Sequence, residues 1–254
     1  MRAAPPGGAA FPPMEPGTDR PYIWVNCATS LDGRLAYAGG KRARLSSPED
    51  LVRVQELRLR VDAILVGVGT ILADDPSLRV HRELLGEEPG ATHDGPRSGP
   101  LRVVLDSQGR TPEGAKVLDG QQPTVLLVSE RARRHFPLSV TTEAFGRDRV
   151  ALRPALRWLR QKRGVRALMV EGGSEVIASF LREGLVDRLT IYFAPRVIGG
   201  RMAPPMVSGT ETEGPEMEVS LRFVSADPLG EGVLLTWEPR GTTGPSGGNS
   251  PPPR

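Results

Sequence analysis

The chain has 254 residues and a nearly balanced charge of +3, from 33 basic and 30 acidic side chains. Apolar residues make up 38% of it and form no run long enough to span a bilayer, so we expect a globular protein that stays out of the membrane. One cysteine, Cys27, and three scattered histidines exclude a disulfide framework and provide no zinc site within the chain. Aromatic residues make up only 5% of the chain, and no stripe of basic residues is interleaved with them, which disfavours nucleic-acid binding.

Both ends of the chain have the composition of tails. Residues 1–19 contain five prolines, and residues 241–254 consist mostly of glycine, proline, serine and threonine. Neither segment offers enough apolar surface to offset the entropy of ordering it. We therefore predict disordered tails at 1–19 and 241–254, one folded domain at 20–240, no targeting segment, and a cytoplasmic location.

Between the tails, short apolar runs alternate with helical patterns. In chain order we expect strand 22–28, helix 47–60, strand 63–69, loop 86–100, strand 101–106, strand 124–129, helix 153–164, strand 167–171, helix 174–184, strand 188–197 and an antiparallel hairpin at 219–239. Several of the strands are continuously apolar, as strands covered on both faces require. The pattern predicts an α/β fold with a mixed, mostly parallel sheet flanked by helices and ending in the hairpin.

The helix boundaries carry their usual signals. Ser47 stands at the N-cap of the first helix, with Pro48 at its first position and Asp50 at the capping-box position. Gly164 and Gly184 follow the other two helices, where a left-handed residue is favoured. We expect one side of the first helix to be buried through its apolar residues Leu51, Val54, Leu57 and Leu59.

The stretch "LMVEGGSEVIASFL" combines a strand end with a helix start. Glu171 ends the apolar run, Gly172 and Gly173 follow it, and Ser174 opens the helix. Free backbone N–H groups and the positive end of the helix dipole then lie at the carboxyl edge of the sheet, where nucleotide phosphates bind. A plain strand-to-helix turn produces the same pattern. Glu171 favours a site, because a carboxylate needs a partner when it is desolvated, and a ligand hydroxyl or ammonium group would supply one.

The stretch "AILVGVGTILADDPSLRV" repeats this design. An apolar strand runs into Gly67 and Gly69, and then into Thr70, Asp74 and Asp75. We call each of these segments, where an apolar strand ends in glycines before a helix, a strand exit. Two such strand exits predict a single ligand crevice between them. A helix end followed by a turn before proline explains the two aspartates equally well. A metal pair is disfavoured because adjacent side chains diverge and no third ligand is spaced nearby.

Four segments together resemble a known family. The segments are "PYIWVNCATSLDGRLA", "GVGTILADDPSL", "LRVVLDSQGRTP", and "EGG" followed by "GLVD" and "AP". In order and spacing, they resemble the reductase of riboflavin biosynthesis. In that family the reductase also forms the C-terminal domain of a bifunctional deaminase-reductase. The resemblance covers residues 20–240 and implies a dihydrofolate-reductase-like fold and a homodimer.

The resemblance also implies an activity. The family reduces a ribosylamino-pyrimidine 5′-phosphate to its ribitylamino form with NADPH, by hydride transfer to C1′ of the ring-opened imine. The cofactor carries the difficult step, and the protein holds the reactants together and excludes water. No metal is required.

The family's functional positions can be carried over onto this sequence. The resemblance implies cofactor contacts at Ala28, Thr70, Asp74, Ser107, Gly173, Ser174, Glu175 and Val176. It implies substrate contacts at Asn26, Arg58, Leu78, His81 and Glu171. Glu171 and Asp74 are the candidate catalytic groups, and either of them or an ordered water could protonate the imine nitrogen. Structural explanations remain open for several positions: a solvated helix face for Arg58, surface for His81, an ordinary turn for Ser107 and core for Leu78.

Two positions depart from the fused bacterial forms. Asn26 stands where those forms carry lysine, and His81 where they tend to carry arginine. The chain also lacks room for the deaminase, so we expect a stand-alone reductase. An amide can accept from an exocyclic amine as well as donate, whereas an ammonium group only donates, which favours the diamino pyrimidine as substrate. With His81 near the phosphate, substrate affinity should fall as the pH rises through about 5.5 to 8.

Three alternatives stay open. The substrate could be the deaminated 5-amino-6-ribosylamino-uracil 5′-phosphate, or the enzyme could be a dihydrofolate or pteridine reductase of the same fold. A nucleotide-binding regulatory protein without turnover is the alternative outside enzymes. Comparing NADPH oxidation with each substrate against NADPH binding alone separates the three.

Overall fold

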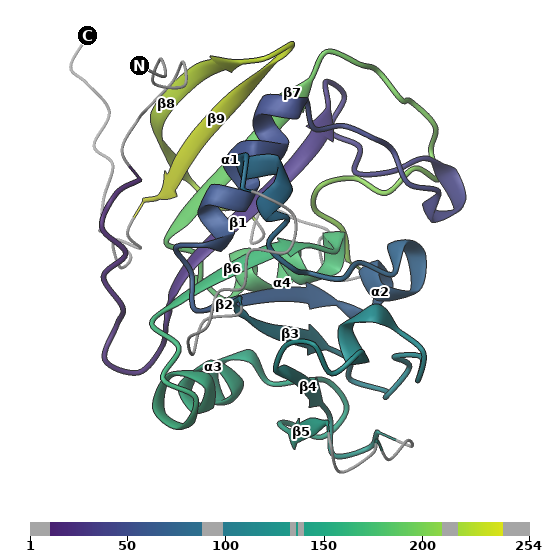
Figure 1. Ribbon diagram of the computed structural model, residues 1–254, viewed down its shortest axis with the longest axis vertical. Helices are drawn as coiled ribbons and strands as arrows, with labels where there is room; N and C mark the ends of the chain where they lie inside the picture. The colour runs from purple at the N-terminus through teal and green to yellow at the C-terminus, as the bar shows by residue number, and fades with distance from the viewer. Residues whose placement is uncertain (1–10, 88–98, 133–135, 137–139, 210–217, 241–254) are drawn as a thin grey trace, which may run out of the picture.

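A computed structural model of the chain describes residues 11–87, 99–132, 136, 140–209 and 218–240. These residues form a nine-stranded sheet in the order β5-β4-β3-β2-β6-β1-β7-β9-β8 (Figure 1). The strands are β1 (Tyr22–Ser30), β2 (Ala63–Gly67), β3 (Leu101–Leu105), β4 (Thr124–Val128), β5 (Thr141–Ala144), β6 (Ala167–Gly172), β7 (Arg188–Ala194), β8 (Leu221–Leu229) and β9 (Gly232–Pro239). The α-helices are α1 (Pro48–Arg58), α2 (Val68–Asp74), α3 (Leu152–Lys162) and α4 (Ser174–Arg182), and short 3-10 turns are η1 (Ala38–Gly40), η2 (Arg82–Leu85) and η3 (Lys116–Leu118).

The pairing of the strands confirms the predicted mixed sheet. All pairs from β5 to β7 are parallel, whereas β9 is antiparallel to both β7 and β8. The carboxyl ends of β1, β6, β2 and β3 therefore lie side by side at one edge. In parallel α/β sheets this is the edge where ligands bind.

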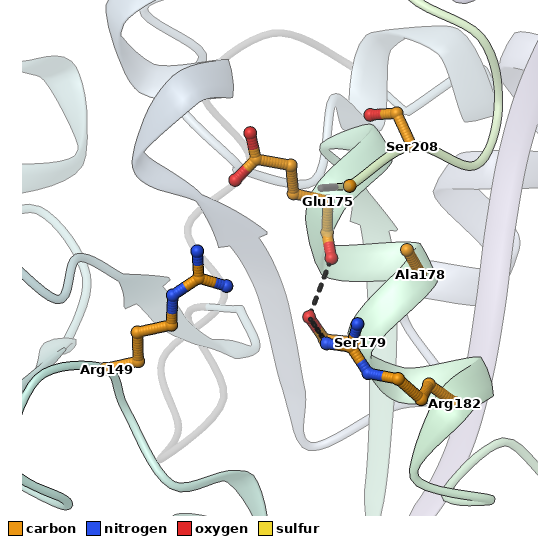
Figure 2. A pocket seen from close by; sticks show the side chains of 7 residues that line it. Arg149, Glu175, Ala178, Ser179, Arg182 and Ser208 are labelled. Carbon is orange, nitrogen blue, oxygen red and sulfur yellow. Dashed lines mark hydrogen bonds between the residues drawn. The ribbon is translucent and has the colours of Figure 1, made fainter. Parts of the chain in front are cut away.

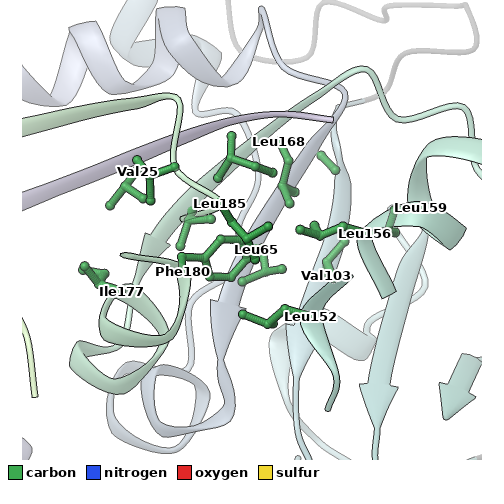
Figure 3. Packing of buried hydrophobic residues seen from close by; sticks show 14 of the residues in the cluster. Val25, Leu65, Val103, Leu152, Leu156, Leu159, Leu168, Ile177, Phe180 and Leu185 are labelled. Carbon is green, nitrogen blue, oxygen red and sulfur yellow. The ribbon is translucent and has the colours of Figure 1, made fainter. Parts of the chain in front are cut away.

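The sheet is covered on both faces, which explains its continuously apolar strands. On one face, Leu65 of β2 packs with Leu156 of α3 and Phe180 of α4 (Figure 3). On the other face, Ile64 of β2 packs with Leu57 of α1 and with residues of α2. Successive residues of a strand point to opposite faces, so both need apolar partners. Each such fully buried side chain contributes about 1.5–3 kcal/mol.

The predicted capping signals are confirmed. The Ser47 hydroxyl accepts a hydrogen bond from the Asp50 backbone N–H at 3.3 Å, as the N-cap of α1. Gly164 and Gly184 adopt positive φ values of 68° and 62°, as expected of the residues that follow α3 and α4. These local signals place three of the helix ends.

The predicted apolar face of α1 is wrong in two of its four residues. Leu57 is buried, but Leu51 and Leu59 are exposed, and the buried positions of α1 include the polar residues Asp50 and Gln55. The physical reason is the surface that α1 covers. Beside the apolar part of the sheet lies a group of polar side chains at the strand ends, and α1 supplies their partners.

Two strand predictions also need correction. The strand expected at 63–69 ends at Gly67, and α2 begins at Val68, so Gly69 and Thr70 belong to a helix. The sequence does not predict the short strand β5, because three of its four residues, "TTEA", are polar and the strand lies at the sheet edge, where residues alternate between half-buried and exposed. Pairing with the buried strand β4 is what makes this segment extended.

The ends of the domain lie partly outside the described residues. Within the predicted tail 1–19, the described part includes Phe11, whose ring makes an edge contact with Trp24 at 5.8 Å, and Met14, which packs on the same core. The predicted loop 86–100 falls mostly on residues 88–98, outside the described residues. The domain boundaries stay predictions. No helix in the described part of the chain combines the length and apolar character that a membrane crossing needs.

Candidate active site

Glu171 occupies an irregular position at the end of β6. The register pairs Leu65 with Val170 and then Val66 with Gly172, which leaves Glu171 as an extra residue in a β-bulge. Bulges turn a side chain away from the regular alternation and are frequent beside active sites. The bulge therefore directs the Glu171 carboxylate out of the sheet toward α1.

Arg58, the last residue of α1, is the partner of Glu171. Its Nε and Nη2 donate to the two carboxylate oxygens at 2.6 and 2.5 Å, and both side chains are 12% exposed. The alternative that Arg58 lies on a solvated face is wrong. The protein itself, rather than a ligand, supplies the charge partner expected for Glu171. Burial alone would lower the pKa of Arg58, but the charge and hydrogen bonds of Glu171 outweigh burial and raise it.

The loop after α2 closes over this ion pair. Arg58 Nη1 donates to the Arg79 carbonyl at 2.5 Å, and the His81 backbone N–H donates to the buried Gln55 side chain at 2.8 Å. Leu78 is buried and adopts a positive φ of 53°, which is strained for leucine. Its side chain belongs to the same hydrophobic cluster as Leu57 and Ile64, as the core interpretation expects, while strained backbone of this kind is frequent at ligand sites.

A buried arginine of β3 supports the same loop. Arg102 is fully buried, and its guanidinium donates to the Ser77 carbonyl at 3.3 Å and to Asp119 Oδ1 at 3.1 Å. Burial lowers the pKa of Arg102, and the nearby Asp119 opposes that change. The strained loop thus has fixed partners on both sides.

Asn26 of β1 lies beside Glu171, because Val25 and Val170, which precede them, are paired in the sheet. The Asn26 amide oxygen accepts from Arg53 Nη2 at 2.8 Å and from the Thr190 hydroxyl at 2.8 Å. Of the two roles expected for this amide toward substrate, accepting and donating, the arrangement favours donating, and the contact itself stays a prediction. Its oxygen already has two donors within the protein.

The two predicted strand exits face each other. A Cβ atom on Gly173 would lie 3.7 Å from Thr70 Oγ1, and a Cβ on Gly67 would lie 2.7 Å from Val176 Cγ2. Gly67 must therefore be glycine for α4 to pack here. Gly172 and Gly173 have φ values of 140° and 89°, in a region that favours glycine. The first turn of α4 and the start of α2 lie together at the carboxyl edge of the sheet.

The other predicted residues lie around this centre. Ser107 follows β3, and its hydroxyl oxygen accepts from the Val150 backbone N–H at 3.1 Å. Asp74 is the exposed last residue of α2, so the helix-end explanation describes its backbone correctly. Ala28 is half-buried on β1, and Ser174 donates from its hydroxyl to the Pro205 carbonyl at 2.5 Å. The cofactor and catalytic roles of these residues stay predictions.

A polar pocket lies along α4 (Figure 2). Its lining residues are Arg149, Glu175, Ala178, Ser179, Arg182, Ser208 and Gly209. Glu175 is among the predicted cofactor residues, and Arg149 directly precedes Val150, the partner of Ser107. The pocket thus extends along α4 from its first turn, and its charged lining residues are two arginines and one glutamate.

Sequence reasoning missed several residues of the site. Asp50 was interpreted only as a cap, and Arg53, Gln55 and Thr190 were not singled out. The one available signal was the irregular spacing of apolar residues on α1, which leaves polar side chains on its buried side. A polar residue buried by a helix is a candidate for a network of hydrogen bonds.

The parallel sheet, its antiparallel end and the paired exits at its carboxyl edge define an α/β protein with a dihydrofolate-reductase-like fold. Residues 21–235 match the model of the RibD C-terminal domain. The chain belongs to the RibD C-terminal domain family.

Individual relatives agree with this assignment. The chain is 41% identical over 221 residues to a protein of Archaeoglobus fulgidus, covering 85% of this chain and 97% of that protein. It is 40% identical over 226 residues to one of Methanothermobacter thermautotrophicus, covering 87% and 100%. Both relatives are named 2,5-diamino-6-ribosylamino-4(3H)-pyrimidinone 5′-phosphate reductase. The structure of Acinetobacter baumannii RibD is similar with a TM-score of 0.72 and 26% identity, over 88% of this chain and 59% of that longer one.

Proposed function

We propose that this oxidoreductase of riboflavin biosynthesis reduces 2,5-diamino-6-ribosylamino-4(3H)-pyrimidinone 5′-phosphate to its ribitylamino form, with NADPH as the reductant. The observation that carries the proposal is the similarity, over nearly their full length, to two archaeal proteins named for that reaction. The substrate is a small molecule. Homodimerisation and a cytoplasmic location stay predictions.

The residues at the strand exits fit a dinucleotide. The glycine conformations at Gly172 and Gly173 leave the backbone open to close approach, and the first turn of α4 offers N–H groups and a positive dipole to phosphate. When bound there, NADPH would supply the hydride for C1′ of the opened ribose. Thr70 and Val176 border the same place. They would contact the nicotinamide ring and exclude water from it.

Glu171 and Arg58 would orient the sugar phosphate. The guanidinium of Arg58 stabilises negative charge on Glu171, so this carboxylate acts best as an acceptor for a substrate hydroxyl or amine. Positioning of this kind is the main contribution of the protein when the cofactor carries the chemistry.

Two arginines support NADPH over NADH. Arg149 and Arg182 line the pocket beside α4, and positive charge next to a dinucleotide site accommodates a 2′-phosphate. Glu175 lines the same pocket, and its carboxylate offsets one of the two arginine charges.

Turnover of candidate substrates tests the proposal directly. We expect the purified protein to oxidise NADPH, followed at 340 nm, with the diamino pyrimidine phosphate, and to be at least about 10-fold less efficient in kcat/KM with the deaminated uracil. NADH in place of NADPH should be the poorer reductant.

Controls in the same assay distinguish the alternatives. Dihydrofolate should give no NADPH oxidation, and oxidation with it would indicate a pteridine reductase. A preference for the deaminated substrate would contradict the proposed substrate. NADPH binding without oxidation by any of the three compounds would contradict an enzymatic function altogether.

The exposed side chain of His81 is the predicted contact for the substrate phosphate. It is 48% exposed, with Nδ1 2.8 Å from a Glu83 carboxylate oxygen. We expect His81→Ala to raise the substrate Kd about 3- to 10-fold, because a hydrogen-bond donor to the phosphate is lost. His81→Arg keeps a donor there and should retain most of the affinity.

Fluorescence titration with a substrate analogue in the absence of cofactor measures the Kd of each variant. A wild-type Kd in His81→Ala would contradict contact between His81 and the phosphate.

A further inference from the structure

A buried ion pair on α1 determines which way the Asn26 amide points. Asp50 and Arg53 are one helical turn apart, with side chains 1% and 11% exposed. Arg53 Nε and Nη2 donate to Asp50 Oδ1 at 2.9 and 2.7 Å, and Nη2 also donates to Asn26 Oδ1 at 2.8 Å. A guanidinium group has donors only, so the amide must present its oxygen to Arg53.

A second donor occupies the same amide oxygen. Trp24 Nε1 donates to Thr190 Oγ1 at 2.9 Å, and Thr190 Oγ1 lies 2.8 Å from Asn26 Oδ1. Because an indole nitrogen can only donate, the Thr190 hydroxyl accepts from Trp24. Its own hydrogen is donated to Asn26 Oδ1, which is closer at 2.8 Å than the Val25 carbonyl at 3.5 Å. Both lone pairs of the Asn26 oxygen are thus used by the protein.

The nitrogen of the same amide is left for a ligand. Asn26 Nδ2 has no hydrogen-bond partner among the residues that the structure describes. It is also not one of the unpaired polar atoms that are completely shielded from solvent in that part of the chain. Asn26 as a whole is 5% exposed, so its small accessible surface includes this NH₂ group. The amide lies beside Glu171, on the face of the sheet that α1 covers.

We propose that Asp50 and Arg53 are positioning residues that hold Asn26 as a hydrogen-bond donor toward the pyrimidine and so select the diamino ring. The inference rests on the proposed function. The diamino pyrimidinone has an unprotonated ring nitrogen between its 2-amino and ribosylamino groups, and the deaminated uracil carries hydrogen on that nitrogen. A fixed N–H donor pairs with the first ring and opposes the second.

The Asp50→Asn/Arg53→Gln double variant tests this role. It removes both charges together, so neither is left unpaired, and the glutamine can donate or accept and no longer fixes the amide. We expect the ratio of kcat/KM for the diamino ring to that for the deaminated ring to fall at least 10-fold, while the Kd for NADPH stays within 2-fold. Arg53→Lys keeps a donor toward Asn26 and should retain most of the selectivity.

Arg20 and Asp187 provide a matched control. They form another two-pronged ion pair, with distances of 2.5 and 2.7 Å, at the amino edge of the sheet. Arg20→Gln/Asp187→Asn removes the same charges away from the site and should leave the substrate ratio unchanged. A purely structural role of Asp50 and Arg53 would make the two double variants alike.

A measurement on the wild-type protein covers the case of a variant that does not fold. The Asn26 side-chain NH₂ signals, assigned in a ¹⁵N–¹H spectrum by their loss in Asn26→Ser, should shift downfield with the diamino substrate and less with the uracil. No shift at saturation, or a folded double variant with wild-type selectivity, would overturn the inference. Failure of the wild-type enzyme to oxidise NADPH with either pyrimidine would instead overturn the proposed function.

Discussion

The Glu171→Gln variant is expected to lose about 100-fold or more in kcat/KM for the diamino pyrimidine. This loss corresponds to about 2.7 kcal/mol of transition-state stabilisation. Glutamine keeps the shape of the side chain but removes the charge that pairs with Arg58 and would orient the substrate. Arg58 then keeps its charge in a largely buried place without a charged partner, so we also expect a lower Tm. Steady-state kinetics and calorimetry measure the two effects separately.

A double variant separates the structural part from the functional part. Glu171→Gln/Arg58→Gln leaves no unpaired charge, so its Tm should return toward the wild-type value. Its activity should stay low, because neither oriented group is restored. Recovery of activity together with stability would mean that the ion pair only holds the fold. A single variant with more than a third of wild-type kcat/KM would contradict a role in the reaction.

The Gly173→Ala variant is expected to weaken NADPH binding by about 10-fold or more. Gly173 caps α4 with φ 89° and ψ 114°, a conformation that an L side chain rarely adopts and that costs about 1–3 kcal/mol. Relief of this strain would rotate the backbone N–H groups at the helix start. The added Cβ would also contact Thr70 Oγ1 and Val176 in the crevice. Fluorescence titration with NADPH measures the effect.

Gly184 provides the control for backbone strain alone. It follows the other end of the same helix with φ 62°, and a Cβ placed there meets no atom within 4 Å. Gly184→Ala should lower stability by about 1 kcal/mol and leave the Kd for NADPH unchanged. Equal weakening of NADPH binding in both variants would attribute the effect to general destabilisation. Unchanged binding in Gly173→Ala would remove the α4 start from the cofactor site.

Much of the fold could be predicted because local patterns agree with the tertiary structure. Continuous apolar runs identified every strand that is buried on both faces, and glycine and proline around residue 230 identified the hairpin β8-β9. The edge strand β5 could not be found in this way. Its extended conformation comes from hydrogen bonds to β4, and polar residues at an edge carry no periodic signal.

The candidate site was only partly predictable. Glu171, Gly173 and Thr70 stand out because carboxylates and glycines at strand exits need an explanation, and the structure brings these exits together. Arg58 was expected from family resemblance. Its contact with Glu171 joins residues 113 positions apart, and no local pattern encodes such a pairing.

The sequence by itself determined the order of strands and helices, the helix ends at Ser47, Gly164 and Gly184, and the family through its motifs. The tertiary structure alone decided which polar side chains of α1, β1 and β7 form hydrogen bonds with one another. It assigned the Asn26 oxygen to Arg53 and Thr190, and of the two roles expected of that amide this leaves donation for a ligand. The physical reason is that hydrogen bonds between distant segments depend on helix and sheet packing, whereas propensity and periodicity describe only neighbours along the chain.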